Sequence, residues 1–244
     1  MAKHSKWNNI KHQKQAEDSK KGKVFTKHAK LIAIVARNGA DPDINPPLRM
    51  AIDNAKAESV PNDNIERAIK KGSGESKDSV LFEELVYEGF GPGGVAMLIE
   101  VLTDKKNRAL GNIRTTMGKR GGRMAESGAV AWMFKKIGEI ILAVQPEQVE
   151  WIELKAIDLG ADDVRADESE GQVYLKITSS PENFGKIRRA LSEKGVHIES
   201  SRLTYEASSK VSLNENSQEM QDLERLINLI EEEDDVSEVF TNLE

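Results

Sequence analysis

Apolar and polar positions follow a distinctive order near the middle of the 244-residue chain. The apolar runs Leu85–Tyr87 and Val95–Leu102 flank the turn Gly89–Gly94, whose glycines and proline supply the backbone angles that a reversal needs. This pattern predicts a β-hairpin with a long connection. A further apolar run, Ala129–Phe134, predicts another strand.

The segment between those strands has helical periodicity. Leu110, Ile113 and Met117 fall on one side of a helix expected from about Asn107 to Gly121, which suits packing against a sheet. The opposite side of this helix is polar and carries Lys105, Arg108, Asn112, Thr115 and Lys119.

The N-terminal part of the chain predicts a small helical bundle preceded by a basic arm. Residues 3–23 are polar almost all round, and a helix without an apolar stripe is not stable alone. Helices are expected at Phe25–Asn38, at 46–59 behind an Asn45 cap, and from Pro61 to Gly72. The residues expected in the bundle core are Leu31, Ile32, Ile34, Val35, Leu48, Ile52, Ala55, Ile65 and Ile69.

After Phe134 the pattern changes to strand, helix, strand, strand, helix, strand. The expected elements are Ile137–Val144, Pro146–Leu159, Asp163–Asp167, Gln172–Thr178, Pro181–Lys194 and His197–Leu203. This order is typical of a ferredoxin-like sandwich.

The last two elements, a helix at Ser217–Glu233 and a strand at Val236–Thr241, have no sheet of their own. Comparison with the preceding helix and strand indicates that they return to the hairpin, so that the intervening segment is an insertion. The predicted fold class is therefore α+β and multi-domain, with an N-terminal helical bundle and two ferredoxin-like domains. The predicted boundaries are a basic arm at 1–24, a helical domain at 25–75, an α+β domain at 79–134 plus 207–244, and an inserted domain at 135–206.

Composition places the chain among globular proteins, with 38% hydrophobic and 31% charged residues. The chain has no cysteine, which excludes disulfides, thiolate metal sites and cysteine nucleophiles. No apolar run approaches the roughly 18–20 residues that span a bilayer, and the charged N-terminus has no apolar core of a secretory signal. We therefore expect a cytoplasmic protein without a membrane partner.

The formal net charge of −6 conceals a strong asymmetry along the chain. Residues 1–40 contain ten lysines or arginines and two acids, whereas residues 215–244 contain eleven acids and only Arg225 as a base. From Asp104 to Lys136 there are nine bases and two acids. Such asymmetry is a hint of contact with a polyanion, and in an anionic protein that contact must be local.

The polar helix face after Thr103 carries cations of one sign with amides and hydroxyls between them, a pattern that favours a reader of phosphate backbones. The alternative is an ordinary solvated helix face. In the N-terminal arm, cations surround one large ring, Trp7, that either stacks on a base or packs against the next helix. The candidate nucleic-acid-binding residues are Lys3, His4, Lys6, Trp7, Lys11, His12, Lys14, Lys23, Lys105, Lys106, Arg108, Asn112, Arg114, Lys119, Arg120 and Arg123.

Signatures of catalysis are weak. The glycine-rich turn lacks the spacing of a nucleotide-binding loop, and the four histidines show no metal-ligand spacing, so we expect no catalytic residue, no metal and no cofactor. An RNA-recognition motif in the inserted domain is also disfavoured, because the strand Gln172–Thr178 offers only Tyr174 and Ile137–Val144 offers no aromatic residue.

Several motifs together resemble the YebC/PmpR family, and the resemblance covers essentially the whole chain. The matching segments are His4–Trp7, Asn9–His12, Gly22–Phe25, Pro61–Gly72, Tyr87–Gly94, Thr103–Arg108 and Val130–Phe134. Lys3, Lys105 and Ala109 depart from the pattern, where glycine, asparagine and threonine are expected.

This resemblance implies a helical N-terminal domain followed by two α+β domains. It also implies two alternative functions. Bacterial members are described as DNA-binding transcriptional regulators, whereas a mitochondrial relative is a translational activator and bacterial members resemble ribosome-acting factors. We favour a translation factor that binds ribosomal RNA and contacts ribosomal proteins through the acidic C-terminal segment. A DNA-binding regulator is the alternative, and a protein-interaction module that binds no nucleic acid is a third hypothesis.

Overall fold

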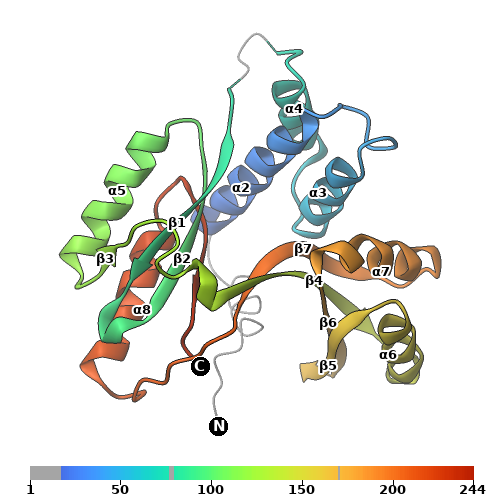
Figure 1. Cartoon of the computed structure of the whole chain (residues 1–244). Helices are drawn as coiled ribbons and strands as arrows, with labels where there is room; N and C mark the ends of the chain where they lie inside the picture. The colour runs from blue at the N-terminus through green and yellow to red at the C-terminus, as the bar shows by residue number, and fades with distance from the viewer. Residues whose placement is uncertain (1–17, 77–79, 170) are drawn as a thin grey trace. The chain divides into compact units, whose positions relative to one another are not determined.

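The computed structural model describes residues 18–76, 80–169 and 171–244. The described residues form seven α-helices and two separate four-stranded sheets (Figure 1). They divide into two compact units. The first contains the described residues up to Phe134 together with Ala207–Glu244, and the second is Lys135–Glu206.

The first unit begins with three helices, α2 (Asp18–Ala36), α3 (Pro46–Ala57) and α4 (Asn62–Gly72). Their apolar faces meet in one core, and Asn45 caps α3 by accepting a hydrogen bond from the Leu48 N–H at 3.1 Å. The expected inward face of α3 is confirmed, with Leu48, Ile52 and Ala55 all buried. Three helices built on regular apolar periodicity thus form the predicted bundle.

The start of this bundle corrects one expectation. The sequence predicts an arm up to residue 24, but residues 18–24 already belong to α2 (Asp18–Ala36). The first turns of α2 are held from a distance: Lys23 and Lys27 donate hydrogen bonds to the backbone carbonyls of Glu232 and Ser237. Because these acceptors lie more than two hundred residues away, the local pattern gives no sign of them.

The first sheet has the strand order β3-β1-β2-β8. Its strands are β1 (Glu83–Phe90), β2 (Ala96–Thr103), β3 (Arg123–Met124) and β8 (Val236–Thr241). The predicted hairpin is confirmed, because β1 and β2 pair antiparallel from Glu83↔Thr103 to Phe90↔Ala96. The C-terminal strand β8 pairs with β2, as the predicted return of the chain requires.

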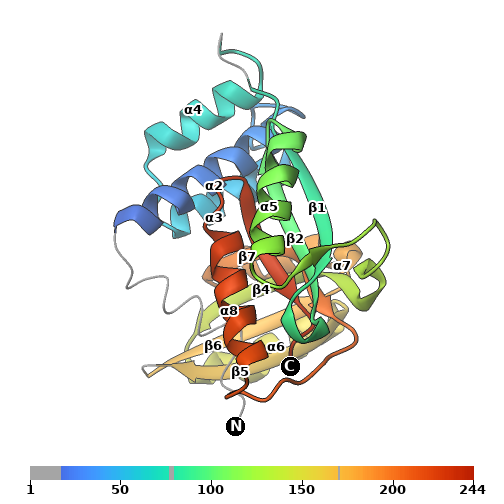
Figure 2. The same cartoon turned by 90° about the vertical axis from the view of Figure 1, so that its left-hand side faces the viewer.

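Two helices, α5 (Lys106–Lys119) and α8 (Gln218–Glu231), lie side by side on one face of this sheet (Figure 2). Their buried residues, which include Ile113, Met117 and Leu223, share one core with the inward side chains of β2. Glycine in the hairpin turn permits this packing: a Cβ on Gly91 would lie 2.7 Å from a methyl group of Leu223. Packing against the sheet and against α8 therefore determines which side of α5 is buried and which side faces solvent.

The strand predicted at Ala129–Phe134 is wrong. Ala131–Met133 forms a single turn, η2, and β4 of the second unit begins at Phe134. The buried carboxylate of Glu88 accepts hydrogen bonds from the backbone N–H groups of Gly128, Val130 and Ala131 at 2.6, 2.7 and 2.9 Å. These N–H groups are directed at a side chain, so they cannot take part in a strand ladder.

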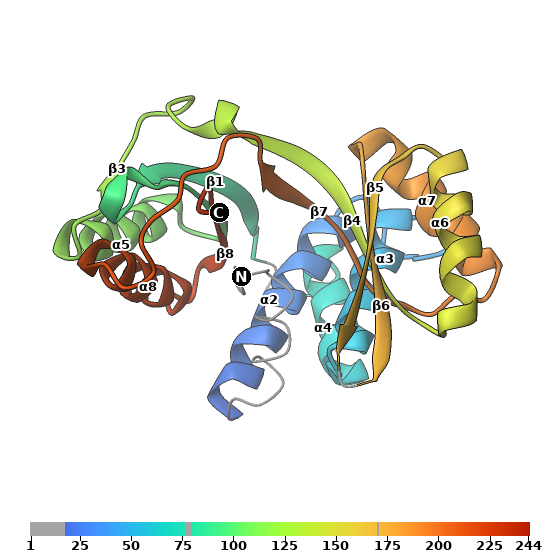
Figure 3. The same cartoon turned by 90° about the horizontal axis from the view of Figure 1, so that it is seen from below.

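The second unit is a ferredoxin-like domain with strand order β5-β6-β4-β7. Its elements are β4 (Phe134–Val144), η3 (Pro146–Gln148), α6 (Val149–Asp158), β5 (Ala161–Ser169), β6 (Gln172–Ser179), α7 (Pro181–Glu193) and β7 (Ile198–Ala207). Both helices lie on one face of the sheet (Figure 3). The predicted fold class, including the insertion of this domain, is confirmed.

Candidate nucleic-acid interface

Helix α5 positions most of the candidate residues that the structure describes. Ala109, Ile113 and Met117 are buried against the sheet, so the helix cannot rotate about its axis without exposing them. The side chains of Lys105, Arg108, Asn112, Thr115 and Lys119 are exposed on the opposite side. The polar face that the periodicity predicts is therefore present at the surface.

At the amino-terminal end of α5, Arg108 is engaged by carboxylates. Its guanidinium lies 2.8 Å from Oδ2 of Asp235, with further hydrogen bonds of 3.0 and 3.1 Å to the same carboxylate, and 3.0 Å from Asp104. These contacts, the Asp235 hydrogen bonds first, raise the pKa of Arg108 further above its ordinary value. Arg108 is therefore positively charged, but Asp235 and Asp104 already accept hydrogen bonds from its guanidinium N–H groups.

Asp235 itself is buried between two cations. The Lys30 ammonium of α2 lies 3.4 Å from Oδ1 of Asp235 and donates hydrogen bonds to the backbone carbonyls of Leu102 at 3.0 Å and Asp234 at 2.7 Å. Only 7% of Asp235 and 9% of Lys30 are exposed. The Asp235 carboxylate therefore links α2 and α5 to the turn before β8, and Arg108 has a structural role in that link.

Two more polar groups of α5 have internal partners, Lys106 at the first position of the helix and Thr116 in its last turn. The Lys106 ammonium lies 2.7 Å from the carboxylate of Glu83, and the Thr116 hydroxyl donates a 3.0 Å hydrogen bond to Glu233. Together with Asp235, Glu233 shows that part of the acidic C-terminal segment neutralises or saturates groups on α5.

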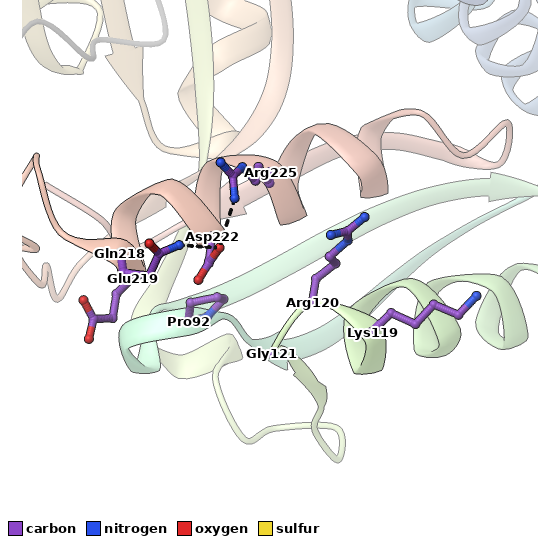
Figure 4. A pocket seen from close by; sticks show the side chains of 8 residues that line it. All are labelled: Pro92, Lys119, Arg120, Gly121, Gln218, Glu219, Asp222 and Arg225. Carbon is purple, nitrogen blue, oxygen red and sulfur yellow. Dashed lines mark hydrogen bonds and ion pairs between the residues drawn. The ribbon is translucent and has the colours of Figure 1, made fainter.

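The carboxyl-terminal end of α5 is different. Lys119, Arg120 and Gly121 form one wall of a shallow groove of about 350 Å³, and α8 forms the other wall with Asp222 and Arg225 (Figure 4). Within the groove, Asp222 lies 3.6 Å from Arg225 and accepts a 3.0 Å hydrogen bond from Gln218. A second hollow, of about 290 Å³, continues along α8 between Arg120, Arg225 and Glu232. The side chain of Lys23 donates to the backbone carbonyl of Glu232, so the structure brings this N-terminal candidate to the same region.

Several candidates keep their charge or polar group available to a ligand. Within the ranges that the structure describes, the side chains of Lys105, Asn112, Arg114, Lys119 and Arg120 make no hydrogen bond or ion pair. Arg123, on β3, stacks its guanidinium 4.4 Å from the centre of the Phe90 ring and remains exposed. The candidates Lys3, His4, Lys6, Trp7, Lys11, His12 and Lys14 lie outside the described residues.

Sequence reasoning missed Arg225, which lines this groove, and Trp132, an exposed ring in η2. Arg225, the single base of an acidic segment, lines the same groove as Lys119 and Arg120, with its guanidinium turned toward Asp222 (Figure 4). Trp132 is 68% exposed, and its indole N–H donates to the backbone carbonyl of Ala129 at 3.1 Å, which fixes the ring. The isolation of Arg225 among acids was a usable signal, whereas the exposure of Trp132 follows from the Glu88 loop and has no local signature.

The described part of the chain contains no group of three or more histidine, aspartate or glutamate side chains placed to hold a metal ion. None of its helices is long and apolar enough to cross a membrane.

Comparison with known proteins gives consistent results along the whole chain. Residues 5–75 match the family described as "TACO1/YebC protein N-terminal domain", and residues 82–243 match "TACO1/YebC second and third domain". A probable transcriptional regulatory protein of Geobacter sulfurreducens is 44% identical, and the alignment covers 100% of this chain and 96% of that protein. A protein of the same description from Halothermothrix orenii is 42% identical over 100% of this chain and 95% of its own length.

A solved structure agrees with the fold. The crystal structure of a conserved hypothetical protein from Aquifex aeolicus superimposes with a TM-score of 0.81 at 38% sequence identity. The match covers 93% of this chain and 91% of that protein.

Proposed function

The chain belongs to the TACO1/YebC family, and we propose that it is a non-enzymatic, nucleic-acid-binding regulator of gene expression that acts on the ribosome through structured RNA. The observation that carries the proposal is the carboxyl-terminal end of α5. There Arg114, Lys119 and Arg120 make no ion pair with any described residue, although the protein as a whole is anionic. Lys119 and Arg120 line the groove, whereas Arg114, five residues before Lys119, projects from another side of the helix. Cations without an internal partner release counterions when a phosphate chain docks, which drives binding.

The groove beside these cations supports the proposal. Arg225 adds a further guanidinium opposite Arg120, and glycine at position 121 lets a backbone approach closely. Asp222 and Glu219 line the same groove, so its potential is mixed rather than uniformly positive. We therefore assign the phosphate contacts to Lys119 and Arg120 on the α5 wall of the groove and to Arg114 on the same helix, with Lys105, Asn112 and Arg123 as further candidates.

The relatives' description as probable transcriptional regulatory proteins favours the alternative, a DNA-binding regulator. Helix α4 is the most basic candidate for a DNA-reading helix in the bundle, but its cations are largely engaged. Arg67 bonds to the Asp63 carbonyl and to Asn64, and the Lys71 ammonium lies 5.3 Å from the centre of the Phe82 ring. A helix that reads base edges needs side chains free to reach them, and this favours RNA recognised through its backbone.

Ribosomal proteins remain a proposed partner of the acidic C-terminal segment. Asp235 and Glu233 are turned inward to Lys30, Arg108 and Thr116, so they are unsuited to that role. Exposed carboxylates on α8, such as Glu219 and Glu224, are the better candidates for contact with basic proteins.

The test is a triple charge reversal, Arg114→Glu, Lys119→Glu and Arg120→Glu, in the full chain. We expect co-sedimentation with ribosomes at low salt to fall at least tenfold, and the salt slope of RNA binding to shrink by roughly 0.7 for each phosphate that the variant no longer neutralises. The matched control reverses three cations elsewhere, Lys56, Lys70 and Lys194, and should keep most of the binding. Unchanged sedimentation of the triple variant would overturn the proposal, and stronger competition by a promoter duplex than by RNA would establish the DNA alternative.

A further inference from the structure

Helix α6 of the second unit carries an apolar stripe that the described part of this unit leaves exposed. Trp151, Leu154 and Ile157 are 42%, 60% and 59% exposed. They are spaced by three residues, which places them on one side of the helix over two turns. The opposite side is already used for folding, because Ile152 and Ala156 are completely buried. Packing of the domain core therefore does not account for the exposed stripe.

Single exposed apolar side chains are ordinary, but three large ones on successive turns form a contiguous patch. Removing the apolar area of such a patch from water favours association with a partner. Trp is also among the residues enriched at the anchor positions of protein–protein contacts. These properties are typical of a binding surface.

The charges on this face define the class of partner. Glu150 lies four residues before Leu154 and seven before Ile157. Asp158 lies four residues after Leu154 and seven after Trp151. At these helical spacings both carboxylates lie on the same side of α6 as the apolar stripe. The rest of α6 adds Glu153 and Lys155, so the helix carries three carboxylates and one ammonium. The charged residues of the edge strand β5 do not contribute, because Asp163, Arg165 and Asp167 alternate with Val164 and Ala166, which pair with the buried Ile177 and Leu175, and so lie on the sheet face away from α6. A surface of this composition repels nucleic acid and anionic lipid. It attracts a cationic partner.

We propose that the exposed face of α6 binds a lysine- and arginine-rich amphipathic segment of another protein, with apolar side chains on Trp151, Leu154 and Ile157 and cations beside Glu150 and Asp158. The mode is a helix laid along an apolar stripe with charged edges. A second copy of this chain does not fit, because two such faces would bring like charges together. The inference goes beyond the proposed RNA contact, since it concerns a different unit and a partner of opposite charge.

The probe is a synthetic fluorescent peptide of leucine and lysine at helical spacing, titrated against the full chain and followed by anisotropy. We expect saturable binding, and a loss of affinity of about tenfold or more in the double variant Leu154→Lys and Ile157→Lys. The matched control, Ile44→Lys with Leu81→Lys, changes two other exposed apolar residues and should bind as the parent does. A peptide with serine in place of leucine should bind weakly.

Three outcomes would overturn the proposal. They are absence of saturable binding by the leucine–lysine peptide, equal binding by the α6 double variant, and equal binding of a leucine–glutamate peptide. Sedimentation velocity provides a separate check: a dimer that the α6 variant converts to monomer would make the stripe a self-interface instead. The Arg114, Lys119 and Arg120 triple variant should bind the peptide normally, so failure of the RNA proposal and failure of this one are distinguishable.

Discussion

The two ends of helix α5 carry similar side chains in different electrostatic situations. At the amino-terminal end, Arg108 is held by Asp235 and Asp104, and Lys106 by Glu83. At the carboxyl-terminal end, Lys119 and Arg120 have no partner in the described part of the chain and border an open groove. The difference arises because Asp235, in the turn before β8, and Glu83 reach the first end, whereas near the second end the same turn contacts a hydroxyl, that of Thr116, through Glu233.

This contrast shows that a run of cations in sequence overstates the charge available to a ligand. Arg108 fits the sequence pattern of a phosphate reader as well as Lys119 does, yet its guanidinium contributes to the joint between α5, α2 and β8. The available charge is what remains after internal ion pairs are subtracted. Predictions about the two ends therefore differ in kind: changes at the first end should alter folding, and changes at the second end should alter binding.

The largest expected effect is at the paired end, in Asp235→Ala. Removing this carboxylate leaves the buried Lys30 ammonium and the Arg108 guanidinium without their shared anion. Breaking a buried pair by removing one partner is strongly destabilising, and we expect the free energy of unfolding to fall by about 3 kcal/mol. Urea unfolding followed by circular dichroism measures it.

The control for this change is Asp222→Ala, which removes a carboxylate from the open groove instead. Asp222 is paired only with Arg225 and Gln218 among the described residues, both at the surface, so its loss should change the free energy of unfolding by less than about 0.5 kcal/mol. If the two variants were equally stable, the contrast between the ends of α5 would disappear.

Much of the fold follows from local patterns. Periodicity places the hairpin, α5 and the six elements of the inserted domain, and the Asn45 cap follows from its position before two prolines. The return of β8 to β2 is predictable because an isolated helix and strand need a sheet to complete. These features depend on residues that are close together in sequence or on an incomplete sheet.

The features that sequence does not reveal depend on single long-range contacts. The engagement of Arg108 depends on a carboxylate 127 residues away, and the early start of α2 depends on carbonyls near the C-terminus. The strand predicted at Ala129–Phe134 is replaced by a loop because Glu88, about forty residues earlier, collects its N–H groups. The local sequence around each of these features is compatible both with the predicted state and with the observed one. Periodicity alone therefore could not distinguish a free from a paired arginine, or a strand from a loop.

Glu88 is a carboxylate whose hydrogen bonds are all made inside the protein, as those of Asp235 are, and its replacement should also lower stability. Burial alone would raise the pKa of Glu88, but the backbone N–H groups of Gly128, Val130 and Ala131 outweigh it and lower the pKa below its ordinary value. Glu88→Gln replaces an acceptor oxygen by a donor facing these groups, and should lower the free energy of unfolding by about 2 kcal/mol.

The pH dependence of Glu88 has a defined sign. A depressed pKa means that the carboxylate stabilises the fold above its unfolded pKa, and that this contribution disappears as the pH falls through the lower folded pKa. The stability gap between the parent and Glu88→Gln should therefore be full at neutral pH and close on acidification. A gap that stays constant below about pH 4, in urea titrations at several pH values, would contradict the assignment.

The smallest expected effect concerns a partly buried carboxylate on the same sheet, Glu100. Burial raises its pKa against the attraction of Lys27, and the carboxylates of Glu84 and Glu238 add to the rise. Glu238 lies directly opposite on β8, and like charges in that position are destabilising. A raised pKa means that ionised Glu100 opposes folding at neutral pH and ceases to do so as the pH falls.

Glu100→Gln should therefore increase the free energy of unfolding at neutral pH by about 0.5 kcal/mol, the opposite sign to Glu88→Gln. Urea unfolding of the two variants beside the parent measures both changes. A decrease in the free energy of unfolding for Glu100→Gln would mean that the attraction of Lys27 outweighs the repulsion by Glu84 and Glu238. Glu100 would then stabilise the fold as a paired charge, as Asp235 does.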